Sequence, residues 1–141
     1  MDKFDNEMRL EFQAKSCNEA LARMTVAAFL TPLNPTLEEL ADTKTAVSEA
    51  VTNAIIHGYG EEEGTVEVWC GRRGKEVFFS VKDTGSGIPD IAAAMEPMYT
   101  TKPEMERSGM GFSFMEAFTD ELSVESAVGE GTVVKMKKVI G

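Results

Sequence analysis

The sequence of 141 residues is poor in cysteine and histidine, the residue types from which zinc centres and disulfide frameworks are built. Its two cysteines, Cys17 and Cys70, lie far apart and form no CxxC pair, so we expect reduced thiols, although a single disulfide also fits. The one histidine, His57, has no second histidine or cysteine at motif spacing. No zinc site is therefore predicted.

Long apolar runs and positive charge are also scarce. No apolar run approaches the roughly 20 residues that a membrane-spanning helix needs, and residues 1–7 are too polar for a signal peptide. The formal net charge is −10, which argues against a nucleic-acid binder because phosphate backbones are bound by a basic field. We therefore expect one cytoplasmic domain over residues 1–141 that binds neither membrane nor nucleic acid.

The two commonest phosphate-binding motifs are missing as well. No GxxxxGKS or GxxxxGKT sequence occurs, and Asp83-x-Gly85-x-Gly87 lacks the third glycine that opens a helix in the dinucleotide fingerprint. Glycines after a strand do let a flat ligand approach the backbone, and the Asp83 carboxylate could accept a hydrogen bond from an exocyclic amine such as that of adenine. A plain turn also explains this segment.

The most informative stretch is residues 46–58, which lie on a predicted helix. At ~100° per residue, Glu49, Asn53 and His57 share one face of this helix. A solvated helix face would explain this polar trio too, but the small and apolar neighbours favour a partly enclosed stripe of the kind found at binding sites. The opposite face is apolar and should pack on a core: Leu40, Val47, Val51 and Ala54.

Two residues of this stripe have side chains suited to phosphate chemistry. The amide oxygen of Asn53 suits Mg²⁺, a hard cation that is bound together with phosphates. Glu49, one turn away, could accept a proton from a hydroxyl nucleophile or orient it. His57 fits better as a structural histidine near a helix end than as a third contact.

A second anion-binding feature lies further along the chain. Gly109-x-Gly111 opens a predicted helix, so it offers backbone N–H groups and the positive end of a helix dipole to an anion. Ser108 and Arg107 come just before it, and Arg107 could hold a terminal phosphate as a forked donor. A surface arginine in a loop fits the same position.

The remaining patterns predict the order β-α-α-β-β-loop-α-β-β. Capping boxes at Ser16-x-x-Glu19 and Thr36-x-x-Glu39 open two helices, which end near residue 30 and near residues 58–60. Because consecutive strands are hairpin-linked, we expect an α+β two-layer sandwich with a mixed sheet and helices packed on one face. The other elements are strands at 7–13, 65–70, 76–81, 122–126 and 132–137, a hairpin loop at 71–74, a short helix and mobile loop at 90–108, and a helix at 112–118.

Four motifs follow one another along the chain: Glu49-x-x-x-Asn53, Asp83-x-Gly85-x-Gly87, Gly109-x-Gly111 and Gly129-x-Gly131-Thr132. In order and spacing they resemble the Bergerat, or GHKL, ATP-binding fold shared by gyrase, Hsp90, histidine kinases and MutL. The resemblance covers nearly the whole chain. Residues 6–12, 43–59 and 99–112 are more narrowly similar to the sporulation anti-sigma F factors, a family of serine kinases of endospore-forming bacteria.

This resemblance implies that the protein binds ATP and Mg²⁺. It implies that Asn53 coordinates Mg²⁺, that Glu49 serves the reacting hydroxyl as base, and that Arg107 lies near the γ-phosphate. Residues 98–111 would form a lid over the phosphates. The lid residues implied to contact the nucleotide are Thr100, Thr101, Lys102, Ser108, Gly109, Met110 and Gly111.

The resemblance also assigns the adenine end of the site. Asp83 would accept from the adenine amine, and Gly85 and Gly87 would leave room for the ring. Thr132 would support the adenine side through its hydroxyl.

Protein partners follow from the same resemblance. The protein would form a homodimer, hold the sigma F subunit of RNA polymerase inactive, and phosphorylate a serine of a small anti-anti-sigma protein. Arg23 matches an arginine that contacts these partners, although it also fits as a solvated helix arginine. Three alternatives stay open: a stress-response anti-sigma kinase with another sigma partner, a nucleotide-sensing sigma binder without phosphotransfer, and a fragment of a sensor histidine kinase.

Overall fold

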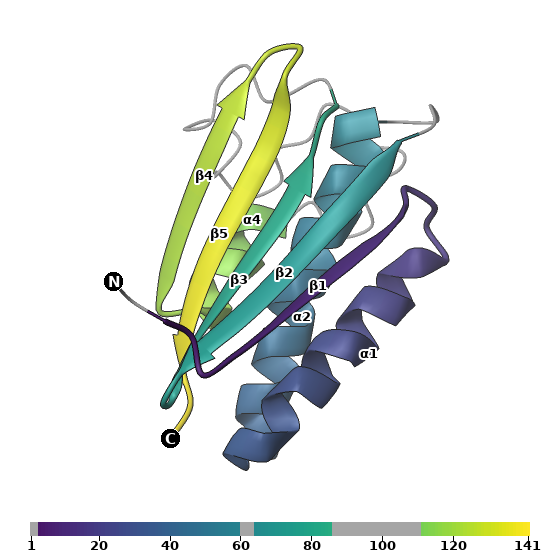
Figure 1. Cartoon of the computed structure of the whole chain (residues 1–141). Helices are drawn as coiled ribbons and strands as arrows, with labels where there is room; N and C mark the ends of the chain where they lie inside the picture. Colours follow the sequence, from purple (N-terminus) through teal and green to yellow (C-terminus); the bar gives the residue numbers. More distant parts are fainter. Residues whose placement is uncertain (1–2, 60–63, 86–110) are drawn as a thin grey trace.

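The computed structural model describes residues 3–59, 64–85 and 111–141, and its elements follow the predicted order (Figure 1). A π-helical turn, η2, continues α2 directly, so the central helix reaches the predicted region near residue 58. The elements are β1 Asn6–Gln13, α1 Asn18–Leu30, the 3-10 turn η1 Thr31–Leu33, α2 Leu37–Asn53, η2 Ala54–Tyr59, β2 Thr65–Arg73, β3 Glu76–Asp83, α4 Gly111–Phe118, β4 Glu121–Ala127 and β5 Gly131–Val139.

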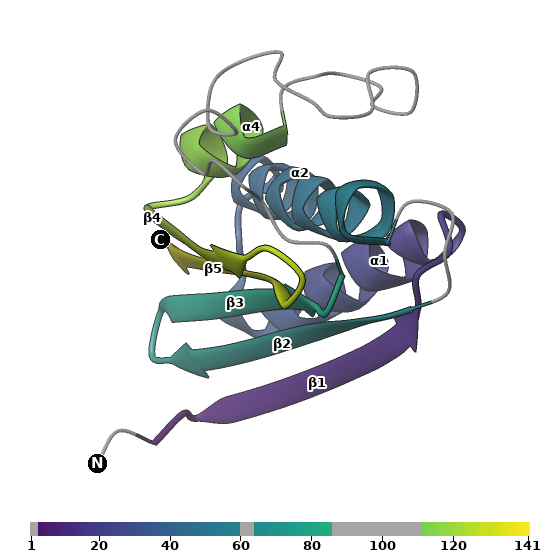
Figure 2. The ribbon, with the colours of Figure 1, turned by 90° about the horizontal axis from the view of Figure 1, so that it is seen from above.

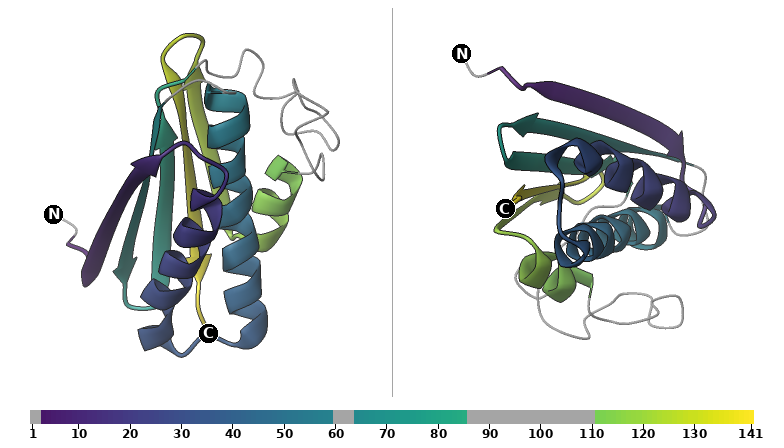
Figure 3. Two further views of the ribbon diagram at one scale, coloured as in Figure 1. Left: turned by 90° about the vertical axis from the view of Figure 1, so that its right-hand side faces the viewer. Right: turned by 90° about the horizontal axis from the view of Figure 1, so that it is seen from below.

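The strands form one sheet in the order β1-β2-β3-β5-β4, and α1, α2 and α4 cover a single face of it (Figures 2 and 3). The predicted α+β two-layer fold is therefore confirmed. The prediction of a mixed sheet is wrong, because all four strand pairs among the described residues are antiparallel. The reason is the place of β5, which lies between β3 and β4 and so separates these two strands, which run in the same direction.

The core lies between the sheet and the helices. Every second residue of the central strands points into it, as a half-covered sheet requires. From the helix side, α2 contributes Val47 and Val51, both fully buried on the face that was predicted to be apolar. Cys70 is buried and unpaired, and burial raises the pKa of its thiol to about 12. Within the described ranges, no helix is long and apolar enough to span a membrane.

The first hairpin is tighter than predicted. Strand β2 runs through Arg73, so most of the predicted loop at residues 71–74 is strand, and the turn is made at Gly74, where φ is +57°. Gly71 lies within β2 and is not part of the turn. A Cβ at Gly71 would lie 2.6 Å from the Trp69 ring, so the missing side chain makes room for the indole on the face of the sheet.

Only one of the two predicted capping boxes forms. At α2, the Thr36 hydroxyl accepts from the Glu39 N–H at 3.0 Å, and the Glu39 carboxylate accepts from the Thr36 N–H at 2.8 Å. The box predicted at Ser16 and Glu19 is wrong, because α1 begins after Cys17 without a side-chain cap. The Glu19 carboxylate is instead engaged by Ser48 of α2.

We expect Thr36→Ala to lower the free energy of unfolding by about 1 kcal/mol, since it leaves the Glu39 N–H in the first turn of α2 without its acceptor. The measurement is urea unfolding followed by circular dichroism. Ser16→Ala is the matched control and should change the free energy of unfolding by no more than about 0.5 kcal/mol, because Ser16 caps nothing. Equal losses in the two variants would contradict the assignment of the caps.

Candidate nucleotide-binding site

The predicted site residues of α2, β3 and β5 come from element ends that meet in one region. Asn53 is the last residue of α2, and η2, which follows it, contacts both β3 and β5. Asp83 is the last residue of β3 and lies opposite Thr132 of β5 in the strand register. Figure 1 shows this end of α2 beside the end of β3.

Asp83 is an unusual carboxylate because only 4% of it is exposed. One of its oxygens accepts from the Gly85 N–H at 2.9 Å, and the Thr132 backbone also donates to the carboxylate. Burial raises the pKa of the Asp83 carboxyl, and these two hydrogen bonds act in the opposite direction. A carboxylate with so little access to water is suited to accept from a ligand donor such as an exocyclic amine.

Thr132 is also buried, and its hydroxyl belongs to a small polar cluster beside Asp83. The Thr132 and Ser126 hydroxyl oxygens lie 2.8 Å apart, and the Ser126 hydroxyl donates to the Gly131 carbonyl at 3.0 Å. Ser126 was not among the predicted site residues. Only the register of the β4–β5 hairpin, which pairs Ser126 with Thr132, brings it to the site.

Gly131 is a further residue whose role was missed. Its φ is +102°, and a Cβ there would lie 2.2 Å from the Asp83 carbonyl oxygen and 2.6 Å from the Thr84 Cα. No side chain fits at that distance. The signal was present in the sequence, since a glycine directly before Thr132 lies opposite the residue after Asp83 once the two strands are paired.

Glu49 and Asn53 lie one turn apart on α2, and both are partly buried. Their helix is held on the core by its opposite face, and its last residue, Asn53, lies at the end of the sheet where β3 ends at Asp83. His57 belongs to η2, and its side chain lies outside the described part of the chain.

Residues 86–110 also lie outside the described part of the chain. Gly111 is the first residue of α4, which packs against α2, and Gly85 donates to Asp83 as described. Eight of the predicted site residues fall within the undescribed segment: Gly87, Thr100, Thr101, Lys102, Arg107, Ser108, Gly109 and Met110.

Arg23, the predicted partner-binding residue, lies on α1, and its side chain is 40% exposed. Its Nη1 atom lies 3.7 Å from the Glu19 carboxylate, one turn earlier on the same helix. The side chain is therefore both accessible to a partner and held by an ion pair.

The fold and the region around Asp83 define a histidine kinase-like ATPase domain. Residues 12–138 match the family described by that name. The fold is similar to that of the RsbU and RsbW domains of a Mycobacterium tuberculosis protein, with a TM-score of 0.69 and 20% identity over 96% of this chain and 32% of that one. It is also similar to the catalytic domain of the histidine kinase ThkA, with a TM-score of 0.57 and 17% identity over 94% of this chain and 97% of that one.

Sequence comparison identifies the smaller family, within these ATPases, to which the chain belongs. The chain is 57% identical over 136 residues to the anti-sigma F factor of Clostridium kluyveri, and the aligned residues make up 96% of each sequence. It is 56% identical over 136 residues to the anti-sigma F factor of Geobacillus kaustophilus, covering 96% of this chain and 93% of that protein. The chain belongs to the anti-sigma F factor family, and its ATPase domain implies that it binds ATP.

Proposed function

We propose that the protein is an ATP-dependent protein-serine kinase that also holds a sigma factor inactive. The proposal is supported above all by the buried Asp83 carboxylate, which lies beside the buried Thr132 at the same end of the fold as Asn53. A buried acceptor suits the amine of adenine. An amide and a carboxylate on the neighbouring helix suit the phosphate end of the same nucleotide.

Each residue then has a separate task. Asp83 orients the base by accepting its amine, and Gly131 keeps the backbone of β5 close to Asp83. Asn53 would hold Mg²⁺, which when bound neutralises charge on the phosphates. Glu49 accepts the proton of the attacking serine hydroxyl, so that the oxygen can attack the γ-phosphate as the bond to ADP breaks.

The partners are proposed from the relatives, which are named anti-sigma F factors. The inhibited partner would be sigma F, and the serine substrate would be its anti-anti-sigma antagonist. Arg23 would contact these proteins, because it is the partly exposed cation of α1 that the resemblance assigns to them. The protein would act in the cytoplasm, where the transcription machinery lies.

Phosphotransfer from labelled ATP with Mg²⁺ to an anti-anti-sigma protein of the same source tests this function. We expect acid-stable label on a serine of that protein, and loss of the label with Asn53→Ala. Asn6→Ala, at the exposed start of β1, is the control and should retain full activity. No transfer by the wild-type protein, with ATP binding and sigma binding intact, would leave a nucleotide-sensing binder in place of a kinase.

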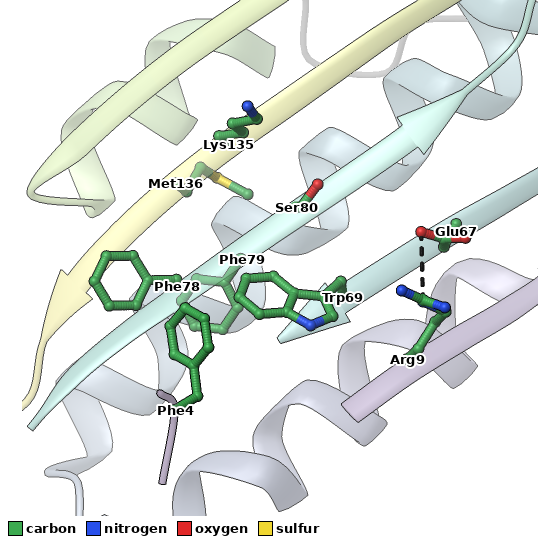
Figure 4. A pocket seen from close by; sticks show the side chains of 9 residues that line it. All are labelled: Phe4, Arg9, Glu67, Trp69, Phe78, Phe79, Ser80, Lys135 and Met136. Atoms are coloured by element: carbon green, nitrogen blue, oxygen red, sulfur yellow. Dashed lines mark ion pairs between the residues drawn. The ribbon is translucent and has the colours of Figure 1, made fainter. Parts of the chain in front are cut away.

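We propose that the protein forms a homodimer through the open face of the sheet, which none of the described helices covers. Phe4, Trp69 and Phe78 cluster there, with ring centroids 5.0 Å apart for Phe4–Trp69 and 5.6 Å for Phe4–Phe78 (Figure 4). The Arg73 guanidinium lies 4.9 Å from the Phe78 ring centroid. The Trp69 indole donates to Glu7 at 3.2 Å. An aromatic and arginine cluster of this kind is typical of the centre of a protein interface.

Charge supports a second copy as the occupant of this face. The chain as a whole is strongly acidic, so two copies repel in general. On the open face, however, lysine and arginine are paired with glutamate: Arg9 with Glu67, Lys135 with Glu125, and Lys137 with Glu76. A patch that carries both signs can match itself across a two-fold axis.

We expect Phe78→Glu to raise the dimer dissociation constant by at least about 30-fold, because it places a charge in the aromatic centre of the interface. Sedimentation velocity over a concentration series measures this. Leu37→Glu, which replaces an apolar residue that is 86% exposed at the start of α2, should leave the dimer unchanged. An unchanged dissociation constant in Phe78→Glu would show that the dimer interface lies elsewhere.

A further inference from the structure

A chain of polar contacts connects the two long helices. The Ser48 hydroxyl of α2 donates to Oε1 of Glu19 on α1. The same carboxylate oxygen lies 3.7 Å from Nη1 of Arg23. Ser48 directly precedes Glu49 in the sequence. One carboxylate therefore joins the helix of the proposed catalytic base to the arginine of the proposed partner surface.

The surroundings of the Glu19–Arg23 ion pair restrict the orientations that the guanidinium can adopt. The Glu19 side chain is only 12% exposed, and it lies in the first turn of α1, where the helix dipole favours a negative charge. The Nε atom of Arg23 is buried and has no hydrogen-bond partner among the described residues. The guanidinium is thus held at one end by Glu19, which in turn is held by Ser48, while 40% of the Arg23 side chain faces solvent.

We propose that Ser48 is a positioning residue that fixes Arg23, through Glu19, in the orientation used to bind a protein partner. This rests on the proposed function, because it takes Arg23 to be the partner contact. A guanidinium already held in one orientation loses less conformational entropy when it pairs with a carboxylate or carbonyl of the partner. Without the Ser48 hydroxyl, the Glu19–Arg23 ion pair is held only by contacts within α1, and the guanidinium can adopt other orientations.

Hydrogen exchange of the Arg23 Nε–H, observed by nitrogen-15 NMR, tests the proposal without any partner. Ser48→Ala should accelerate this exchange about tenfold, because loss of the Ser48–Glu19 hydrogen bond frees the guanidinium and lets water reach the Nε–H that is buried in the wild type. Ser48→Thr, which keeps the hydroxyl, should show the slow exchange of the wild-type protein. Thr25→Val is the matched control, because the Thr25 hydroxyl bonds only within α1, to the Leu21 carbonyl. Unchanged exchange in Ser48→Ala would overturn the proposal.

Partner binding supplies the second measurement. Ser48→Ala should weaken the binding of the sigma factor from the same source about tenfold, with ATP affinity unchanged. In an Arg23→Ala background, Ser48→Ala should cause no further loss, because Ser48 acts through Arg23. Independent, additive losses would overturn the proposal. A wild-type protein that binds no sigma factor would refute the proposed function, and the exchange measurement would still decide the role of Ser48.

Discussion

Glu49→Gln should lower the rate of phosphotransfer by about 100- to 10,000-fold while leaving ATP binding within a few-fold of the wild type. The substitution keeps the size and hydrogen-bonding reach of the side chain but removes the group that accepts the serine proton. Glu49 is partly buried one turn before Asn53, and we expect the helix to keep its place in the variant because its opposite face packs on the core. Single-turnover phosphotransfer under saturating ATP measures the chemical step directly.

The matched control for this variant is Glu38→Gln on the same helix. Glu38 is exposed in the first turn of α2, at the opposite end from Asn53. Its loss should leave the rate within about twofold, since only a weak favourable contact with the helix dipole is removed. A full rate in Glu49→Gln would mean that the serine proton leaves without this carboxylate, and Glu49 would then have a structural role.

Gly131→Ala should be the most damaging small substitution in the described part of the chain. The new methyl group would overlap the Asp83 carbonyl oxygen, 2.2 Å away, on a backbone whose φ of +102° already disfavours any side chain. We expect the free energy of unfolding to fall by at least about 3 kcal/mol. We also expect ATP affinity to fall at least tenfold in the protein that remains folded, because β5 must move away from Asp83.

Gly129→Ala separates the cost of the positive φ from the cost of the overlap with Asp83. Gly129 lies in the same hairpin with a φ of +81°, but apart from its two chain neighbours no described residue has a heavy atom within 4 Å of the new Cβ. It should therefore show the cost of the backbone conformation alone, about 1 kcal/mol, with ATP affinity unchanged. Urea unfolding and nucleotide titration of both variants give the comparison. Equal effects at the two glycines would mean that the close approach to Asp83 does not matter.

The local elements were largely predictable because their signals are local. Alternation of apolar residues along β1, the wheel of α2 and the Thr36–Glu39 box are each written within a few residues of sequence, and the structure has all three. The box at Ser16 and Glu19 has the same local signature and does not form. There, a hydroxyl almost thirty residues away, that of Ser48, engages the carboxylate that the box requires.

The fold class, the order of the elements and the polar face of α2 that carries Glu49 and Asn53 could be predicted from the order of the residues alone. This was possible because apolar periodicity and helix signals act over short distances. The place of β5 between β3 and β4, by contrast, depends on how distant strands pair, and this pairing makes the sheet antiparallel and places Thr132 opposite Asp83. The close contact at Gly131 depends on the same strand order, and the link from Ser48 to Arg23 depends on the packing of α1 against α2, because each joins residues that are distant in sequence.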